Sequence, residues 1–328
     1  METIITSHLE GIKFGEIQTH KHVTVVPLLS GNGSGPAYLT MKEAIELSLL
    51  TVTEVSEGGH VPELKVINRA DKPVLLIDGE ELIGAKQNRV LNTTILLKEK
   101  SETVIPVSCT EHGRWSYKSG QFEESAYMMS ANLRNIKNMS VSYSLNNSRR
   151  FASDQGAVWD GISAQAETAG VHSATGAMRD IHEARKEDLD DWLEHYPLAE
   201  EQKGLLVMVN GKAVGLDMVS DTGAFSVIYL KLIRSYLMDA ILEKPGKGKA
   251  ASSHEKGKSF ISKILTCTEK RYDSVGHGQD YRYEGKKIVG SALIHKNTVI
   301  HMAFFGITEA EKAGHMSPLS LRKMNRTR

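Results

Sequence analysis

The chain has 328 residues, and its 40 basic side chains balance 40 acidic ones, so no overall charge draws it to nucleic acid or to an anionic membrane. The opening "METIITSHLEGIKFGEIQTHKH" is charged throughout and no later apolar run is long enough to span a bilayer, which predicts a cytoplasmic protein without membrane contact. The two cysteines lack the spacing of metal ligands and argue against a disulfide framework or a structural zinc site.

Residues 1–118 are predicted to be rich in antiparallel strands. Runs such as "HVTVVPLL", "KPVLLID" and "ETVIPVS" are apolar, rich in β-branched residues and separated by turn clusters. One helix is expected within them, at "YLTMKEAIELSLL", where apolar residues recur near helical spacing and Thr40 supplies an N-cap.

Residues 119–150 are dense in Ser and Asn and only weakly periodic, which predicts a long excursion with little regular structure. Basic residues stand at Arg134, Lys137, Arg149 and Arg150, and again over 244–258. They lack interleaved aromatic residues, so solvated loops are a better interpretation than an RNA surface, and nucleic-acid binding is not expected.

Residues 151–328 are predicted to be helical and mixed. The stretch "SDQGAVWDGISAQAETAG" fits a helix capped by Ser153 or Asp154, and "TGAMRDIHEARKEDLDDWLEHY" continues the helical pattern. A further helix, "VIYLKLIRSYLMDAIL", is expected to bury one apolar stripe, made of Leu230, Ile233, Leu237 and Ile241.

Hairpins are expected at Asn210-Gly211 and at Glu284-Gly285, each between apolar arms. Blocks of strands, helices and hairpins in succession indicate an α+β fold with a strand-rich antiparallel N-terminal half, a helical middle and a mixed, hairpin-containing C-terminal part.

The stretch "DGEELIGAKQNRVLN", residues 78–92, concentrates polar side chains between two predicted strands. Convergence on one pocket for a charged small molecule competes here with a solvated hairpin of scattered charges. The side chains that carry the pocket hypothesis are acids, cations and amides: Asp78, Glu80, Glu81, Lys86, Gln87, Asn88 and Arg89.

The stretch "IPVSCTEHGRW", residues 105–115, is the second candidate. Strand alternation places Glu111 at the end of a face that begins apolar, beside Arg114 and Trp115. Arg suits phosphate and Trp suits a planar ring, although an ion pair with an aromatic plug explains the same residues. A nucleophilic Cys109 paired with His112 is disfavoured, because Cys109 sits among core positions.

Metal ligands are not assigned. His295 and His301 lie at even separation in one strand-like run and are therefore expected on the same face of a strand. Two histidines on one face are only weak evidence for a metal site, so the metal and the cofactor stay unknown. The sequence has no Walker loop, no GxGxxG after a strand and no GxSxG elbow, which excludes ordinary kinases, dehydrogenases and α/β-hydrolases.

These motifs, with "SDQGAVWDGI" and "GKAVGLDMVSDTGAF", resemble an uncharacterised prokaryotic domain family named for its association with ADP-ribosylglycohydrolases and rhodanese-phosphatases. The likeness runs from "VTVVPLL" to "KLIRSYLMDAI". It implies one family unit over residues 1–328, with approximate lobes at 1–118 and 151–328 joined by the excursion at 119–150.

The resemblance points to NAD and ADP-ribose metabolism, most simply to a hydrolase. Glu111 would act as general acid or base, Glu80 or Glu81 would stabilise a ribosyl cation, and Trp115 would stack on a ring. The ligand-binding residues that it implies are Lys86, Gln87, Asn88, Arg89, Asn92, Arg114 and Trp115, with Asp154, Gln155, Trp159 and Asp217 in a second tier.

Two other functions stay open. The same pocket would serve a non-catalytic nucleotide-sensing or regulatory module, and the basic excursion would serve an RNA-associated factor. The expected partner is a small-molecule nucleotide or ADP-ribosyl ligand, and a homodimer is a reasonable prior for a protein of this size.

Overall fold

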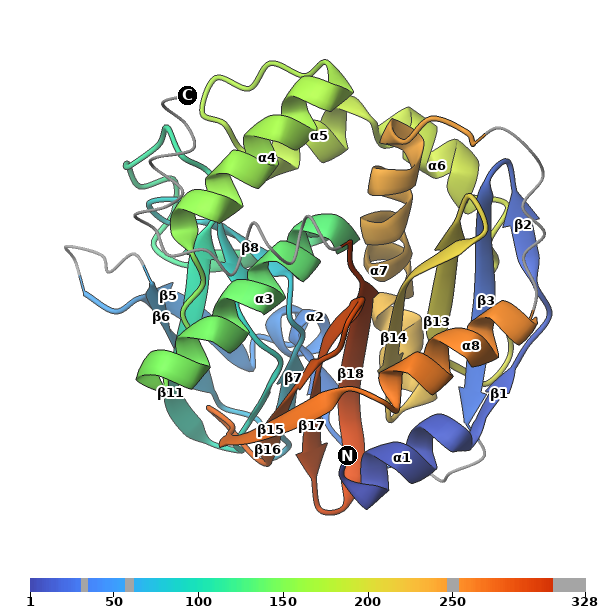
Figure 1. Ribbon diagram of the computed structural model, residues 1–328. Helices are drawn as coiled ribbons and strands as arrows, with labels where there is room; N and C mark the ends of the chain where they lie inside the picture. The colour runs from blue at the N-terminus through green and yellow to red at the C-terminus, as the bar shows by residue number, and fades with distance from the viewer. Residues whose placement is uncertain (31–34, 57–61, 247–253, 309–328) are drawn as a thin grey trace.

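The computed structural model describes residues 1–30, 35–56, 62–246 and 254–308 and shows the predicted α+β fold. Figure 1 shows the large sheet running from the right to the lower centre, with α1 and α8 in front of it, the smaller sheets at the left, and α4 and α5 at the top. The helices are α1 (Thr3–Glu10), α2 (Met41–Glu46), α3 (Ala131–Ser148), α4 (Gln155–Ala169), α5 (Met178–Ala184), α6 (Lys186–Leu193), α7 (Thr222–Leu242) and α8 (His254–Ile264).

The large sheet is antiparallel and runs in the order β1, β3, β13, β14, β18, β17, β16, β15, with β2 also paired to β3. It therefore joins the beginning of the chain to its last third. Its strands are β1 (Ile12–Phe14), β2 (Gln18–His20), β3 (Val23–Ser30), β13 (Gln202–Val209), β14 (Lys212–Val219), β15 (Thr268–Asp273), β16 (Gln279–Glu284), β17 (Ile288–His295) and β18 (Thr298–Gly306).

Two smaller sheets are formed by the residues between β3 and α3. One runs β12, β8, β9, β11, β6, β5, and the other runs β10, β7, β4, where β4 and β7 are parallel. Their strands are β4 (Leu39–Thr40), β5 (Leu50–Glu54), β6 (Glu63–Asn68), β7 (Val74–Leu76), β8 (Glu80–Gly84), β9 (Arg89–Leu91), β10 (Ile95–Leu97), β11 (Ser101–Cys109) and β12 (Phe122–Met128).

Both faces of the large sheet are covered, which explains the continuous apolar sequence of β13. Leu205 and Val207 face a core shared with α7 and with residues of the smaller sheets, whereas Leu206 and Met208 face a core shared with α1 and α8. A third core lies between α2 and the smaller sheets. The helix α7 contacts β12 as well as β13 and β14, so it connects the sheets.

Several predicted elements are confirmed. Thr40 caps α2 in a reciprocal capping box with Glu43, and Asp154 caps α4 by accepting a hydrogen bond from the amide of Ala157 (3.1 Å). The hairpins at Asn210-Gly211 and Glu284-Gly285 join β13 to β14 and β16 to β17.

The excursion predicted over 119–150 is wrong, because β12 and the long helix α3 occupy most of it. The face of α3 that the sequence presents as polar is buried: Arg134 and Lys137 are both 0 % exposed. The buried face of α3 mixes these cations with apolar residues such as Leu133 and Val141, so its apolar periodicity is too weak for the sequence to have indicated a helix.

Two smaller expectations are also wrong. Leu230 belongs to the predicted buried stripe of α7 but is 53 % exposed, while Ile233 and Leu237 are buried as expected. His295 ends β17 and His301 lies in β18, because Lys296 and Asn297 adopt positive φ and turn the chain between them.

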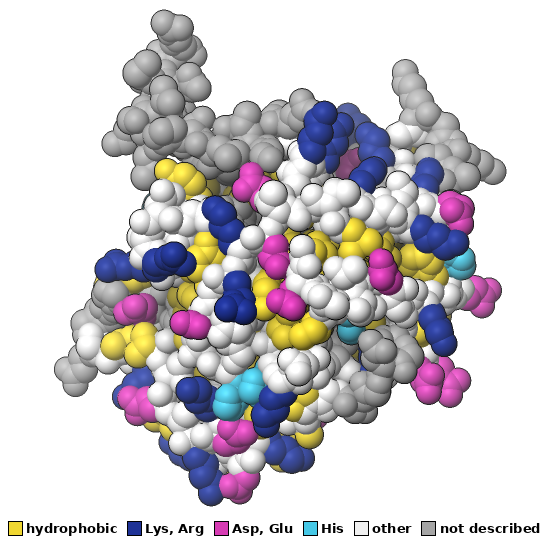
Figure 2. Space-filling model, turned by 60° about the horizontal axis from the view of Figure 1, so that its bottom comes forward, with side chains coloured by type: hydrophobic (Ala, Val, Ile, Leu, Met, Phe, Trp, Pro, Cys, Tyr) yellow, Lys and Arg dark blue, Asp and Glu magenta, His cyan; other side chains and the backbone are white. Residues whose placement is uncertain are grey.

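The basic connector predicted over 244–258 lies in part outside the described residues, and its end from His254 onward is helical. Basic and acidic side chains are mixed over the face of the molecule in Figure 2, with hydrophobic atoms visible between them. None of the helices in the described part of the chain is both apolar enough and long enough to cross a membrane.

Candidate functional site

The two polar motifs meet in the structure at the ends of β8, β9 and β11. β9 pairs with both β8 and β11, which places residues 89–91 of the first motif beside residues 107–109 of the second. Thr110 donates a hydrogen bond to Oε1 of Glu81 (2.8 Å), and the amide of Asn88 donates to Oε2 of Glu111 (3.3 Å). We call Glu81, Glu111, Thr110 and Arg114 the Glu81–Glu111 cluster.

Glu81 is completely buried and is held by hydroxyl groups. Thr110 donates to one carboxyl oxygen, and Ser125 of β12 donates to the other (3.0 Å). Burial raises the pKa of Glu81 to about 7, with a smaller contribution from the charge of Glu111 and with both hydroxyl hydrogen bonds acting against the rise. At neutral pH this carboxyl group is therefore divided between its protonated and ionised forms.

Glu111 has the opposite environment. Arg114 contacts Oε2 of Glu111 through Nε (2.8 Å) and Nη2 (2.6 Å), and Thr175 donates to Oε1 (2.9 Å). Burial acts to raise the pKa of Glu111, but the hydrogen bonds and charge of these partners outweigh it and leave the pKa below the usual value. Glu111 is therefore an ionised carboxylate.

The guanidinium donors of Arg114 are occupied by acceptors of the protein itself. Besides Glu111, its guanidinium donates to the carbonyls of Ala85 (2.7 Å) and Ser116 (2.9 Å) and to the side chain of Asn88 (3.2 Å). This geometry fixes the loop after β11 and orients Glu111. It leaves Arg114 little capacity to bind a phosphate in this conformation.

An exposed aromatic surface lies beside the cluster. Trp115 is 48 % exposed and Tyr117 is 53 % exposed. The Nζ of Lys86 lies 5.3 Å from the centre of the Trp115 ring and 5.0 Å from the centre of the Tyr117 ring. A cation between two accessible aromatic faces suits a ligand that combines a planar ring with negative charge.

Arg89 and Gln87 lie beneath this surface rather than on it. Nη1 of Arg89 donates to the side chain of Gln87 (3.2 Å), and Nη2 lies 3.7 Å from Glu54. The guanidinium of Arg89 lies 5.8 Å from the centre of the Trp115 ring, so it supports the ring from inside. Arg89 is fully buried, which favours a structural role.

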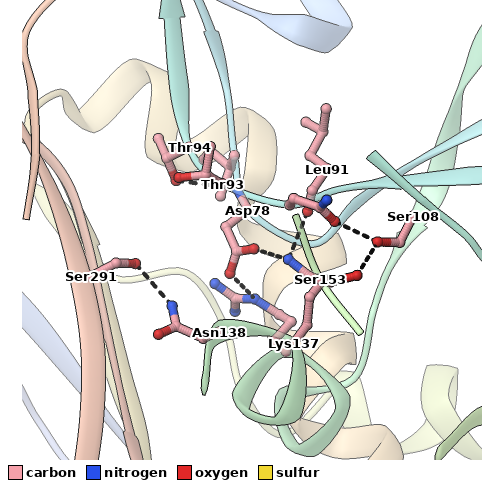
Figure 3. Close-up of polar contacts among 12 residues, drawn as sticks. Asp78, Leu91, Thr93, Thr94, Ser108, Lys137, Asn138, Ser153 and Ser291 are labelled. Atoms are coloured by element: carbon pink, nitrogen blue, oxygen red, sulfur yellow. Dashed lines mark hydrogen bonds and ion pairs between the residues drawn. The ribbon is translucent and has the colours of Figure 1, made fainter. Parts of the chain in front are cut away.

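A second polar group lies in the middle of the molecule and begins at Asp78. Figure 3 shows Lys137 of α3 directed at the Asp78 carboxylate, and Lys137 also donates to the carbonyl of Leu91 (2.7 Å). Nε of Arg134 lies 3.7 Å from Asp78. Burial lowers the pKa of Lys137 to about 8, against the opposing effect of Asp78.

Gly79 has φ +90°, and a Cβ there would lie 2.8 Å from Arg134, so the close approach requires glycine.

Asp217 completes this group from β14. Arg134 donates to both of its oxygens (2.9 and 2.7 Å), Tyr236 donates to Oδ2 (2.5 Å), and a ring nitrogen of His301 lies 3.2 Å from Oδ1. Burial opposes ionisation of Asp217, but Arg134 and His301 hold its pKa well below the usual value. We call Asp78, Lys137, Arg134 and Asp217 the central ion network.

Glu80 belongs to neither group. It accepts a hydrogen bond from the amide of Ile77 (2.7 Å) and contacts Lys231 of α7, which also contacts Glu124 of β12. Glu80 therefore anchors α7 to the smaller sheet and lies apart from Glu81, its neighbour in sequence, because successive strand residues face opposite sides.

The second-tier residues Gln155 and Trp159 pack α4 against β11 and the loop that follows it, and Asn92, which was expected to bind the ligand, makes internal hydrogen bonds beside them. The side-chain amide of Gln155 accepts from the Cys109 amide (2.7 Å) and donates to the Cys109 carbonyl (2.9 Å). Asn92 accepts from Ser108 (2.6 Å), which contacts Ser153 just before the helix (Figure 3). The ring of Trp159 lies 4.3 Å from that of His112, edge to face.

Sequence reasoning missed the residues that complete both groups. Thr110 and Ser125 donate hydrogen bonds to the Glu81 carboxyl group. Arg134, Lys137 and Tyr236 contact the carboxylates of the central ion network. Their positions depend on tertiary pairing, so their spacing holds no signal.

No group of three or more His, Cys, Asp or Glu suited to a metal ion occurs among the described residues. Cys109 is buried, and burial raises its pKa to about 11, which fits a core position.

The fold and these two groups define the class of protein as an α+β domain built around buried ionisable side chains. Residues 11–305 match the model of the ARPP-1 family, described as the ARG and Rhodanese-Phosphatase-superfamily-associated Protein domain. The match covers most of the chain, so the protein belongs to this family, whose name ties it to systems associated with ADP-ribosylglycohydrolases. Searches of curated proteins and of solved structures find no match.

Proposed function

We propose that the protein hydrolyses an ADP-ribosyl or other NAD-derived compound at the Glu81–Glu111 cluster. The observation that carries the proposal is the meeting of the two motifs on a pair of carboxyl groups with opposite environments, Glu81 among hydroxyl groups and Glu111 on an arginine. The family's association with ADP-ribosylglycohydrolases supports the substrate class.

The pair supplies the two protonation states that cleavage of a glycosidic bond needs. Protonated Glu81 donates its proton to the leaving group as the bond to C1′ breaks, and the charge of Glu111 stabilises the ribosyl cation. Water then adds to C1′, and its released proton returns to Glu81. Glu81 takes the acid-base role in this scheme, because Arg114 and Thr175 hold Glu111 in its ionised form.

The aromatic surface would hold the substrate. Trp115 and Tyr117 offer faces for a base or nicotinamide ring, and Lys86 between them offers a charge for the diphosphate. Arg114 acts through Glu111 as a positioning residue, since its donors already meet acceptors of the protein.

The test is product formation from NAD and from ADP-ribosylated substrates, followed by chromatography for the wild type and three variants. We expect Glu81→Gln to lower turnover by about 100-fold or more while retaining binding. Trp115→Ala should raise KM more than it lowers kcat, because the ring binds the substrate and does not react. Glu123→Gln, at an exposed position of β12, is the matched control and should behave as the wild type.

A non-catalytic sensing module is the second candidate, and the internal contacts of Arg114 favour it. A guanidinium whose donors are already taken by Glu111, by main-chain carbonyls and by Asn88 is suited to holding the site in a fixed shape. In that case the wild type binds an ADP-ribosyl compound, Trp115→Ala weakens binding, and no variant forms product. Ligand binding by the wild type without product would replace the hydrolase proposal by this one.

A further inference from the structure

A cavity of about 890 Å³ lies on another side of the molecule, between α3, α4, α7, α8 and the end of β18. Its size falls within the range of sites for small molecules and cofactors. None of Glu81, Glu111, Arg114 or Trp115 lines it, so it is distinct from the Glu81–Glu111 cluster.

Four lysines line the cavity. Lys256 and Lys263 project from the same face of α8, four residues before and three residues after Phe260. Lys212 directly follows the β13–β14 turn as the first residue of β14, and Lys287 lies in the β16–β17 turn. Among the described residues, no ion pair engages Lys212, Lys263 or Lys287, and all three are exposed. Asp239 and Glu243 are the acids of the lining, so positive charge prevails.

The interior of the cavity is apolar and partly aromatic. Its walls include Leu133 and Ile136 of α3, Val214 of β14, Phe260 of α8 and Phe305 of β18. Such walls suit a flat or apolar body of a ligand, while the lysines suit its anionic end.

Buried acceptors in the lining indicate where donors of a ligand would be held. Asn135 is 3 % exposed and Gln165 is 8 % exposed, and the side-chain oxygen of each accepts no hydrogen bond from the part of the protein that the structure describes. Nε2 of Gln165 is fixed by the Asp239 carboxylate (3.0 Å) and by Ser130 (2.9 Å), whereas its buried oxygen has no donor among the described residues. Buried acceptors without donors are uncommon in proteins and are often completed by a ligand or water.

We propose that this cavity binds a phosphorylated small molecule that carries a ring with hydrogen-bond donors. The phosphate contacts the lysines from α8 and the two turns, the ring lies against Phe260 and Phe305, and the donors meet Asn135 and Gln165. The site is additional to the one proposed for hydrolysis and does not depend on it.

The test is isothermal titration calorimetry of the whole protein with AMP, ribose 5-phosphate, inorganic phosphate and adenosine. We expect AMP to bind most tightly, ribose 5-phosphate and phosphate more weakly, and adenosine weakest, with affinity for AMP falling as salt rises. Lys263→Gln combined with Lys287→Gln should weaken AMP binding by about tenfold or more. Lys258→Gln, on α8 but outside the cavity lining, is the matched control and should leave the affinity unchanged.

A second variant tests AMP binding in the cavity without changing any charged side chain. Ala164→Phe at an exposed position of α4 places a large side chain at the wall of the cavity and leaves the lysines unchanged, so it should weaken AMP binding with little effect on folding. Trp115→Ala should bind AMP as the wild type does. If Trp115→Ala loses AMP while Ala164→Phe and the lysine variant keep it, the ligand sits at the proposed hydrolase site and the cavity proposal is overturned. Absence of binding by all four compounds overturns it as well.

Discussion

Glu81 and Glu111 show how the surroundings of a carboxyl group decide its chemistry. From the sequence, Glu111 was expected to be the acid or base and Glu80 or Glu81 to stabilise a cation, whereas the surroundings favour Glu81 for proton transfer. Glu81 receives hydrogen bonds from Thr110 and Ser125 in a buried site, whereas Glu111 receives them from Arg114 and Thr175. The difference in pKa follows from burial, which dominates at Glu81, and from the partners of Glu111, which outweigh burial there; the four partners come from three separate parts of the chain.

The raised pKa of Glu81 predicts a pH dependence of stability that Glu81→Gln removes. Between the usual value of 4.5 and about 7, the folded protein keeps a proton that the unfolded chain releases, so the free energy of unfolding falls as pH rises through this window. Glutamine does not titrate. The Tm of Glu81→Gln relative to the wild type should therefore increase steadily from pH 4.5 to 7, as followed by circular dichroism, whatever constant offset the lost acceptor causes. Parallel curves for the two proteins would contradict the raised pKa.

Asp217 is predicted to be the most sensitive residue of the central ion network. Asp217→Asn leaves Arg134 buried without its full countercharge, which should cost about 3–5 kcal/mol of unfolding free energy. Tyr236→Phe removes one hydrogen bond to the same carboxylate and should cost about 1–2 kcal/mol. Urea denaturation measures both. Equal stability of Asp217→Asn and the wild type would show that the network contributes nothing to folding.

At the scale of elements, the docking of α4 onto β11 depends on one side chain. Gln155 pairs with both main-chain groups of Cys109, as a neighbouring strand would do. Gln155→Ala should leave a buried donor and a buried acceptor unpaired, cost about 2–4 kcal/mol, and speed hydrogen exchange of the Cys109 amide. Glu167→Ala, exposed on the same helix, should change neither quantity. Unaltered exchange at Cys109 in Gln155→Ala would rule out this docking role.

The predictable elements are those whose signals are local. The Thr40 capping box, the Asp154 cap and the Asn210-Gly211 turn each depend on residues adjacent in sequence, and each is confirmed. The helix α3 was missed because its buried face carries Arg134 and Lys137, whose partners Asp78 and Asp217 lie far away in sequence. A buried ion pair gives no apolar periodicity, so composition indicated a solvated loop.

The candidate site was predictable in part for the same reason. The polar composition of residues 78–92 and 105–115 was enough to mark both stretches as candidate site segments. Their contact through Asn88 and Glu111 follows from the pairing of β9 with β11. Which side chains reach the surface depends on strand faces and on loop geometry. Lys86 and Trp115 reach it, whereas Arg89 is buried beneath them.

On the scale of the whole molecule, the large sheet joins the first strands to the last third of the chain. β3 (Val23–Ser30) pairs with β13 (Gln202–Val209), and residues of both approximate lobes share the core around α7. From this shared sheet and core we propose that the two lobes form one folding unit.

This topology predicts that fragments 1–118 and 151–328 will not fold alone. Each would expose apolar strand faces and unpaired edges that the other covers in the whole chain. We expect the full chain to unfold in one cooperative transition and each fragment to show none, as measured by circular dichroism during urea denaturation. A cooperative transition in either fragment would mean that the lobe is an independent domain.

The most direct test of the central claim is a crystal structure of the protein with ADP-ribose bound. We predict that the ligand lies on Trp115 and Tyr117, with its diphosphate at Lys86 and its ribose directed at Glu81 and Glu111. ADP-ribose found elsewhere on the protein, or bound nowhere at concentrations far above those of a cell, would contradict the assignment of the Glu81–Glu111 cluster as the functional site.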